Sequence, residues 1–97
     1  MEDTQQPLQV EIDEPVARGQ YTNLALITHS ETEFILDYLF LQPQATKTKV
    51  LARLITSPVH AKRLLWALKD NVEKYEARHG AINAGQGPAE PRAGVYQ

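Results

Sequence analysis

The stretch YTNLALITHSETEFILDYLF, from Tyr21 to Phe40, holds two segments rich in β-forming residues on either side of the polar turn HSETE. In the first segment the apolar residues do not keep to one face of a strand, and in the second they fall on both faces around Asp37. Because successive side chains of a strand point to opposite faces, both strands are predicted to be covered on two sides. The short turn between them favours antiparallel pairing.

Segments before and after this hairpin also show the two-residue period of a β-strand. Residues 8–12, LQVEI, alternate apolar and polar side chains and predict a half-buried strand, which the loop DEPVARGQ separates from the hairpin. Residues 47–56, KTKVLARLIT, follow the loop after Pro43 and predict a further strand. Since short connections place consecutive strands side by side, the sequence predicts a four-stranded antiparallel meander.

A long helix is predicted directly after the last strand, from Ser57 to Gly80. Ser57 is a suitable N-cap, Pro58 suits the first helical position, and Gly80 suits the residue that follows the helix. Apolar side chains recur at helical spacing and form one stripe, which we expect to pack on the sheet in an α+β domain. This apolar stripe consists of Ala61, Leu64, Leu65, Leu68, Val72 and Tyr75.

The chain of 97 residues is long enough for one small domain, which we place at residues 8–82. Residues 1–7 are polar, and residues 83–97 are rich in Gly, Pro and Ala, so we expect the first to be disordered and the second flexible. The lack of cysteine excludes disulfides and thiolate metal sites and fits a cytoplasmic protein, and no export signal or membrane-spanning apolar run is evident. The net charge of −2 argues against a surface that binds phosphates throughout.

The motifs YTNLALITHSETEFILDYLF and SPVHAKRLLWALKDNVEKYEARHG together resemble a family of uncharacterised bacterial proteins, domain of unknown function 3467. The resemblance covers residues 8–82 and implies a bacterial or archaeal single-domain protein in which strands precede a helix. It implies no activity, because the family has none assigned. The order of four strands and one long helix is also similar to the protomer of the export chaperone SecB, but in topology alone, which is a weak argument for function.

The turn HSETE and its surroundings carry the residue types of two kinds of reactive site. His29, Glu31 and Glu33 lie at alternate positions and include ligand types for a divalent metal, but no second cluster completes a coordination sphere. Ser30 has His29 beside it and Asp37 downstream, as in a hydrolase triad, but no nucleophile-elbow motif surrounds it. A polar turn accounts for these residues. We therefore expect no catalytic, metal-binding or cofactor-binding residue and no enzyme activity.

Trp66 lies on the helix away from the apolar stripe, on the side of Val59 and Ala77. Tryptophan is enriched at the centres of protein interfaces, so either a partner covers Trp66 or a groove or the tail of the same chain does. The two-sided strands also require a layer besides the helix, and a second copy of the chain is the simplest source. We therefore predict a homodimer formed through the sheet or the helix. Its candidate contacts are Phe34, Leu36, Tyr38, Phe40, Leu51, Ile55 and Trp66.

Basic residues of the last strand and of the first helical turns form a second candidate surface. Such residues contact phosphates in a salt-dependent way, although a solvated charged face is the simpler interpretation. No interleaved aromatic residues provide base stacking. The sequence thus predicts a non-enzymatic homo-oligomeric adaptor for a protein or peptide, with a chaperone-like variant, and nucleic-acid binding is the alternative. The candidate nucleic-acid contacts are Lys47, Lys49, Arg53, Lys62 and Arg63.

Overall fold

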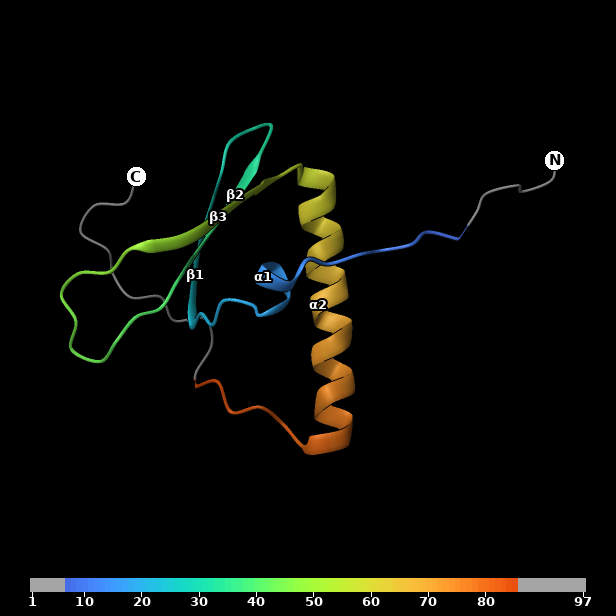
Figure 1. Cartoon of the computed structure of the whole chain (residues 1–97). Helices are drawn as coiled ribbons and strands as arrows, with labels where there is room; N and C mark the ends of the chain where they lie inside the picture. Colours follow the sequence, from blue (N-terminus) through green and yellow to red (C-terminus); the bar gives the residue numbers. More distant parts are fainter. Residues whose placement is uncertain (1–6, 86–97) are drawn as a thin grey trace.

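A computed structural model of the chain describes residues 7–85. The described residues form an α+β structure with a three-stranded antiparallel sheet, a single-turn helix before it and a long helix after it (Figure 1). The elements are α1 (Glu14–Ala17), β1 (Leu24–His29), β2 (Phe34–Leu39), β3 (Val50–Thr56) and α2 (Pro58–His79).

The sheet has the strand order β1-β2-β3, so consecutive strands are neighbours as predicted. The β1–β2 ladder runs from the pair Leu24 and Leu39 to the pair His29 and Phe34, next to the polar turn. On its other side β2 pairs with β3, and an irregularity at Tyr38 and Leu39 shifts that register. Beyond this shift one extra β3 residue, Leu51, stands without an opposite partner, as in a β-bulge.

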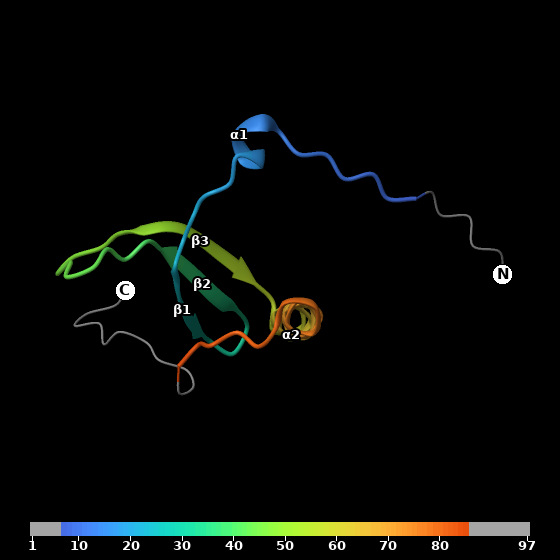
Figure 2. The same cartoon turned by 90° about the horizontal axis from the view of Figure 1, so that it is seen from below.

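The prediction of a four-stranded meander is wrong for the described chain, which has three strands. Residues 7–13 form an extended arm that leads away from the sheet, and Figure 2 shows that this arm also lies apart from α2 (Figures 1 and 2). The turn of α1 separates this arm from β1, with the amide of Ala17 donating to the Asp13 carbonyl at 2.8 Å, and Gly19 at φ 77° redirects the chain. The arm therefore has the alternation of a strand but no neighbouring strand among the described residues. The last strand is also shorter than predicted, because β3 begins at Val50 and not at Lys47.

Among the described residues, fully buried side chains are confined to the central strand, β2. Leu36 and Leu39 are 7% and 3% exposed and are the buried apolar side chains among residues 7–85. Asp37 lies between them on β2 and is 0% exposed. A small domain gains its stability by removing apolar surface from water, and two leucines remove very little. The described chain therefore leaves most of its apolar surface without a covering layer.

The ends of α2 are formed as predicted. The Ser57 hydroxyl accepts a hydrogen bond from the amide of His60 at 3.1 Å, Pro58 occupies the first turn, and Gly80 follows the helix at φ 94°. The expected packing of α2 on the sheet is wrong, because α2 has no buried residue. Figure 2 shows the helix end-on, beside the end of β3 and off both faces of the sheet. One residue, Ser57, joins β3 to α2, and so short a connection starts the helix at the end of the sheet.

The predicted domain at residues 8–82 falls within the described part of the chain. Most of the two predicted flexible ends, residues 1–6 and 86–97, lies outside the described residues. Among residues 7–85, no helix combines the length and the apolar character needed to cross a membrane.

Candidate protein-binding surfaces

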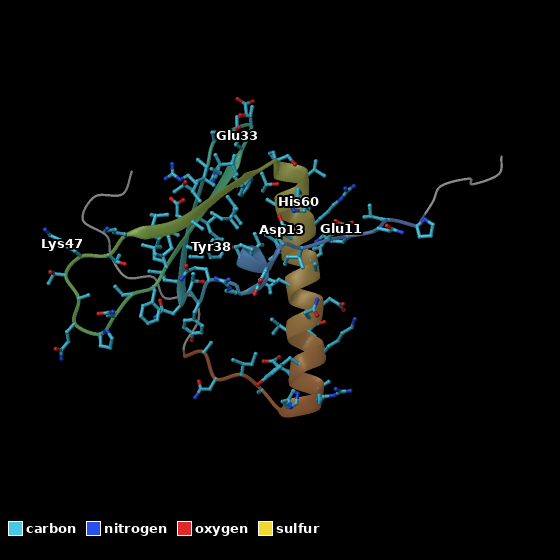
Figure 3. All side chains as sticks on the ribbon, in the orientation of Figure 1. Glu11, Asp13, Glu33, Tyr38, Lys47 and His60 are labelled. Carbon is cyan, nitrogen blue, oxygen red and sulfur yellow. The ribbon has the colours of Figure 1, made fainter. Side chains whose placement is uncertain are left out.

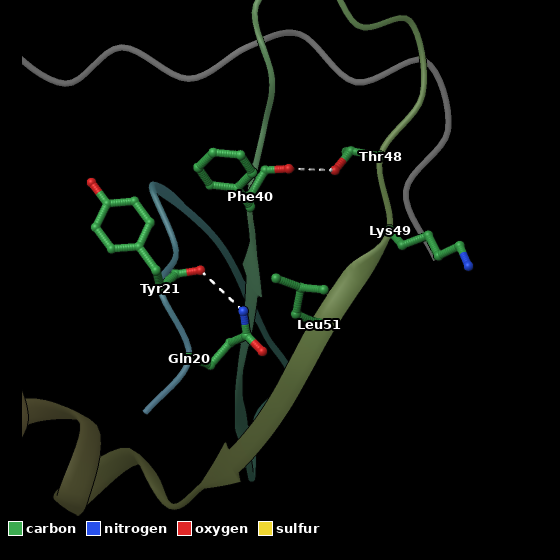
Figure 4. Close-up of a pocket in the computed structure, with 6 residues that line it drawn as sticks. All are labelled: Gln20, Tyr21, Phe40, Thr48, Lys49 and Leu51. Carbon is green, nitrogen blue, oxygen red and sulfur yellow. Dashed lines mark hydrogen bonds between the residues drawn. The ribbon is translucent and has the colours of Figure 1, made fainter. Parts of the chain in front are cut away.

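An apolar hollow lies where the start of β3 meets the loops that flank the sheet. Its volume is about 420 Å³, and its wall is formed by Gln20, Tyr21, Phe40, Thr48, Lys49 and Leu51 (Figure 4). The rings of Tyr21 and Phe40 meet edge to face with centroids 5.9 Å apart, an arrangement that aromatic pairs favour. The Leu51 side chain adds an aliphatic wall from β3. Two rings and one branched side chain form a surface suited to an apolar group.

Backbone and side-chain hydrogen bonds hold the walls of this hollow in place. The hydroxyl of Thr48 donates to the Phe40 carbonyl at 3.2 Å, which ties the two ends of the β2–β3 loop together (Figure 4). The Asn23 side chain donates to the Leu41 carbonyl at 2.9 Å and accepts from the Leu41 amide at 2.8 Å. Asn23 therefore acts as an additional rung beyond the β1–β2 ladder and fixes the chain on both sides of the aromatic pair. Sequence reasoning missed this role.

The outer edge of β3 borders the hollow. Among the described strands β3 pairs with β2 alone, so its other edge has no strand beside it. Val50, Leu51, Leu54 and Ile55 are exposed large apolar residues of this strand. An edge strand with apolar side chains is a template for pairing with another chain. Lys49 lies at the rim of the hollow and gives this end of the edge a positive charge (Figure 4).

A buried ion pair joins the central strand to the same edge strand. Both guanidinium nitrogens that face Asp37 donate to its carboxylate: Nε of Arg53 to Oδ1 at 2.7 Å and an Nη of Arg53 to Oδ2 at 2.8 Å. Asp37 and Arg53 are opposite one another in the β2–β3 register, which places the two side chains on one face. The Asp37 side chain is fully buried, whereas that of Arg53 remains 44% exposed. The pair fixes the β2–β3 register, because a slip of one residue would leave Asp37 buried without this cation.

A second uncovered apolar surface runs along α2. Leu65, Leu68 and Tyr75 of the apolar stripe are 62%, 59% and 52% exposed, while Ala61 and Val72 are half-buried. Trp66, on another side of the helix, is 58% exposed, and Lys62 Nζ lies 5.6 Å from the centre of its ring. Within the described residues nothing buries Trp66, so the alternative in which a groove of the same chain covers it is not seen there.

The residues predicted as partner contacts divide among different parts of the molecule. Leu36 belongs to the small core, and Phe34 and Tyr38 share its face of β2 and are half-buried. Ile55 lies opposite Ile35 on the other face of the sheet. The exposed members of the set are Phe40, Leu51, Ile55 and Trp66.

The five basic residues do not lie together on one surface. Arg53 is engaged by the Asp37 carboxylate. Lys47 projects from the β2–β3 loop at one extremity of the molecule, whereas His60 marks the first turns of α2, where Lys62 and Arg63 also lie, on the opposite side of the sheet (Figure 3). The structure thus separates Lys47 and Lys49 from the helix pair.

The turn HSETE forms a compact hydrogen-bonded loop at the tip of the β1–β2 hairpin, where Glu33 is labelled in Figure 3. The Ser30 hydroxyl accepts from the amides of Thr32 and Glu33 at 3.3 and 3.2 Å. The ring of His29 stacks against that of Phe34 with centroids 5.3 Å apart. The Ser30 hydroxyl binds backbone amides and the Asp37 carboxylate binds Arg53. These hydrogen bonds therefore do not link Ser30, His29 and Asp37 as a catalytic triad. No cluster of metal-ligand residues is present in residues 7–85.

The comparison with family models places this chain in a family. It belongs to the family described as Protein of unknown function (DUF3467), whose model matches residues 1–84. No curated protein and no solved structure was found to match the chain. The topological similarity to the SecB protomer depended on four strands, and the described chain has three.

Proposed function

We propose that this protein is a non-enzymatic, homo-oligomeric binding module that takes a protein partner as an extended peptide along the outer edge of β3. One side chain of the peptide occupies the hollow between Tyr21, Phe40 and Leu51. The hollow is the observation that carries the proposal, because it places an apolar site beside an unpaired strand edge. Peptides that add a strand to a sheet gain affinity from backbone hydrogen bonds and specificity from such side-chain sites.

Charge around the hollow indicates the type of peptide. Lys49 lines the hollow, and Lys47 lies two residues earlier on the same loop. Neither lysine forms an ion pair within the described residues, whereas Arg53 further along β3 is engaged with Asp37. The favoured peptide therefore has an apolar residue flanked by acidic ones, since complementary charge selects partners and speeds their association.

The homo-oligomeric part of the proposal is supported by the uncovered apolar surface. Leu36 and Leu39 are the buried apolar residues of the described chain, while the stripe of α2 and the strand β3 are exposed. A core of this size offsets little of the conformational entropy lost on folding, and association is a common way for small domains to bury more. Light-scattering mass measured after size-exclusion chromatography is expected to give at least a dimer, and a monomer at all concentrations would contradict this part.

A displayed library of random eight-residue peptides tests the peptide-binding part. The protein is expected to enrich sequences that alternate apolar and other residues and carry acidic neighbours. Leu51→Lys, which places a charge in the hollow, should abolish this enrichment. Ile27→Lys is the matched control, because Ile27 is an exposed apolar residue of β1, across the sheet from the outer edge of β3, and does not line the hollow.

Retained enrichment in Leu51→Lys, or equal loss in both variants, would contradict the proposed site. Circular dichroism of each variant shows that the fold is unchanged before binding is compared. Enrichment of many unrelated apolar sequences, still lost in Leu51→Lys, would support the chaperone-like variant of the same function.

A further inference from the structure

The apolar stripe of α2 contains a heptad pattern that packing on a sheet does not require. Without Leu64, the residues of the stripe are spaced alternately by four and three residues, and His79 continues this spacing to the end of the helix. This alternation is the a/d repeat of helices that pair side by side, with side chains of one helix fitting between those of the other. The positions of the repeat are Ala61, Leu65, Leu68, Val72, Tyr75 and His79.

The helix has the length and the freedom that such pairing needs. It comprises 22 residues, or about 33 Å at the rise of an α-helix. Its own sheet does not cover it, since none of its residues is buried and Leu65 and Leu68 are more than half exposed. Ser57 and Gly80 cap it within the chain, so the helix is complete at both ends and lacks only a partner for its stripe.

We infer that α2 pairs antiparallel with α2 of a second copy of the chain. The inference rests on the homo-oligomeric part of the proposed function and identifies the surface that forms the contact. In the register that overlaps residues 61–79 of the two helices, positions of the repeat face each other when their numbers add up to 140. The flanking residues that directly follow positions 61, 68 and 75 face each other when their numbers add up to 138. Leu65 then faces Tyr75 of the second copy, Leu68 faces Val72, and Ala61 faces His79. Every apolar position of the repeat except Ala61 thus meets an apolar partner. Ala61, the smallest residue of the repeat, meets the imidazole of His79.

Charges that flank the repeat favour the antiparallel arrangement over the parallel one. In the antiparallel register Lys62 of each copy lies across from Glu76 of the other, so symmetry provides two pairs of opposite charge. In a parallel, in-register pair the flanking positions bring Leu64 to Lys69 and Asn71 to Glu76, and no pair of opposite charges forms. The antiparallel pair also brings Lys69 of one copy close to Lys69 of the other near the two-fold axis. Repulsion between these two flexible lysines destabilises the dimer, but the two attractive pairs oppose it.

Charge exchange tests this register. Lys62→Glu and Glu76→Lys, each alone, place like charges across the interface and are expected to weaken dimerisation about tenfold or more, as measured by sedimentation equilibrium. The double variant restores both pairs with reversed signs and should return to within about threefold of the unmodified protein. The recovery is the informative result, because the Glu76 carboxylate also accepts a hydrogen bond from the Ile82 amide at 2.9 Å, which Glu76→Lys alone removes.

Cysteine cross-linking tests the direction of the helices, and the chain has no natural cysteine to interfere. In an antiparallel pair the two copies of position 65 lie about 15 Å apart along the axis, so Leu65→Cys alone should give no disulfide-linked dimer. The variant that combines Leu65→Cys with Tyr75→Cys should cross-link on mild oxidation. Cross-linking of Leu65→Cys alone would indicate a parallel pair and overturn the inference.

The outcomes separate this inference from the proposed function. An unmodified protein that is monomeric at all concentrations overturns both the homo-oligomeric proposal and the helix pair. If neither charge reversal changes the dissociation constant of the dimer and positions 65 and 75 do not cross-link, the helix pair alone is overturned. The sheet is then left as the dimer contact. In either case, retained peptide enrichment would support the peptide-binding site at the β3 edge and would not bear on the helix pair.

Discussion

The hairpin of β1 and β2 and the helix α2 are both well-formed local structures, but they differ in what surrounds them. The hairpin holds the buried residues Leu36, Asp37 and Leu39 and is fixed by ladder hydrogen bonds on both sides of β2. The helix is capped at both ends and buries nothing. In proteins, most of the stability of a helix comes from the packing of its apolar face rather than from the helix itself. The sheet is thus stabilised by contacts within the protomer, whereas the described residues leave most of the apolar stripe of the helix uncovered.

The largest effect is expected from Arg53→Met, which acts on the sheet. It leaves the fully buried Asp37 carboxylate without the guanidinium that donates two hydrogen bonds to it. Loss of one partner of a buried ion pair destabilises a protein by about 3–5 kcal/mol. Asp37→Asn should cost less, because Arg53 is 44% exposed and water can solvate it. Urea unfolding at a fixed protein concentration measures both, and an equal or reversed order would contradict this account of the pair.

The same substitution made in each region compares them directly. Leu39→Ala removes side-chain atoms from the core and should lower the free energy of unfolding by about 2–5 kcal/mol. Leu65→Ala removes the same atoms from an exposed helix position and should change the unfolding of the dilute protomer by less than about 0.5 kcal/mol. It should instead weaken dimerisation in sedimentation equilibrium. A large loss of protomer stability in Leu65→Ala would show that the helix packs within its own chain.

Asn23→Ala is expected to weaken the open end of the hairpin. It removes both hydrogen bonds between the Asn23 side chain and the Leu41 backbone, which together are worth about 1–2 kcal/mol. The amide of Leu41 should exchange with deuterium faster, and binding in the hollow should weaken, since Phe40 lies directly before Leu41. Asn71→Ala is a control, because the Asn71 side chain bonds only within α2, to the Ala67 carbonyl. Unchanged exchange at Leu41 would contradict the role of Asn23.

Ser57→Ala tests whether the helix can be destabilised separately from the sheet. The change removes the hydroxyl that accepts from the His60 amide and should destabilise α2 by about 1 kcal/mol. In the dilute protomer this loss should appear as reduced helicity by circular dichroism, with the β-sheet signal unchanged. At concentrations that favour the dimer the helicity should recover. A simultaneous loss of helix and sheet would show that the two regions fold as one unit within the protomer.

The smallest effect is expected on nucleic-acid binding. Lys47 and Lys49 lie apart from Lys62 and Arg63, and Arg53 is engaged with Asp37. The combined variant Lys47→Glu and Lys49→Glu should therefore leave the weak retention of labelled DNA or RNA unchanged at physiological salt, while it weakens the binding of acidic peptides. Strong retention by the unmodified protein that this variant abolishes would support the nucleic-acid alternative instead.

Local signals in the sequence predicted the elements of the fold but not their packing. The alternation and two-sided apolar pattern of residues 24–39, with the polar turn between them, correctly predicted an antiparallel hairpin. Ser57, Pro58 and Gly80 correctly predicted the ends of α2. The alternation of residues 8–12 predicted a strand that the described chain does not contain, because a strand also needs a neighbour to receive its hydrogen bonds.

The candidate site followed from the sequence only in part. Apolar residues of β2, β3 and α2 were predicted as contacts, but the hollow depends on Tyr21 and Phe40, which are nineteen positions apart and meet only because the hairpin brings its ends together. The pairing of Asp37 with Arg53 had a signal in the sequence, since Asp37 is a lone charge within an apolar strand. Its partner became identifiable once the β2–β3 register was known.

The sequence by itself determined where the strands and the long helix form, because turn chemistry, capping and side-chain period act over a few neighbouring residues. It also placed the heptad spacing on α2, which is a property of the order of residues alone. Only the tertiary structure decided that the helix lies beside the sheet and that residues 7–13 extend away from the sheet. Both placements depend on the direction of the chain at Ser57 and at the α1 turn. The uncovered stripe, the open β3 edge and the hollow beside it are consequences of that direction.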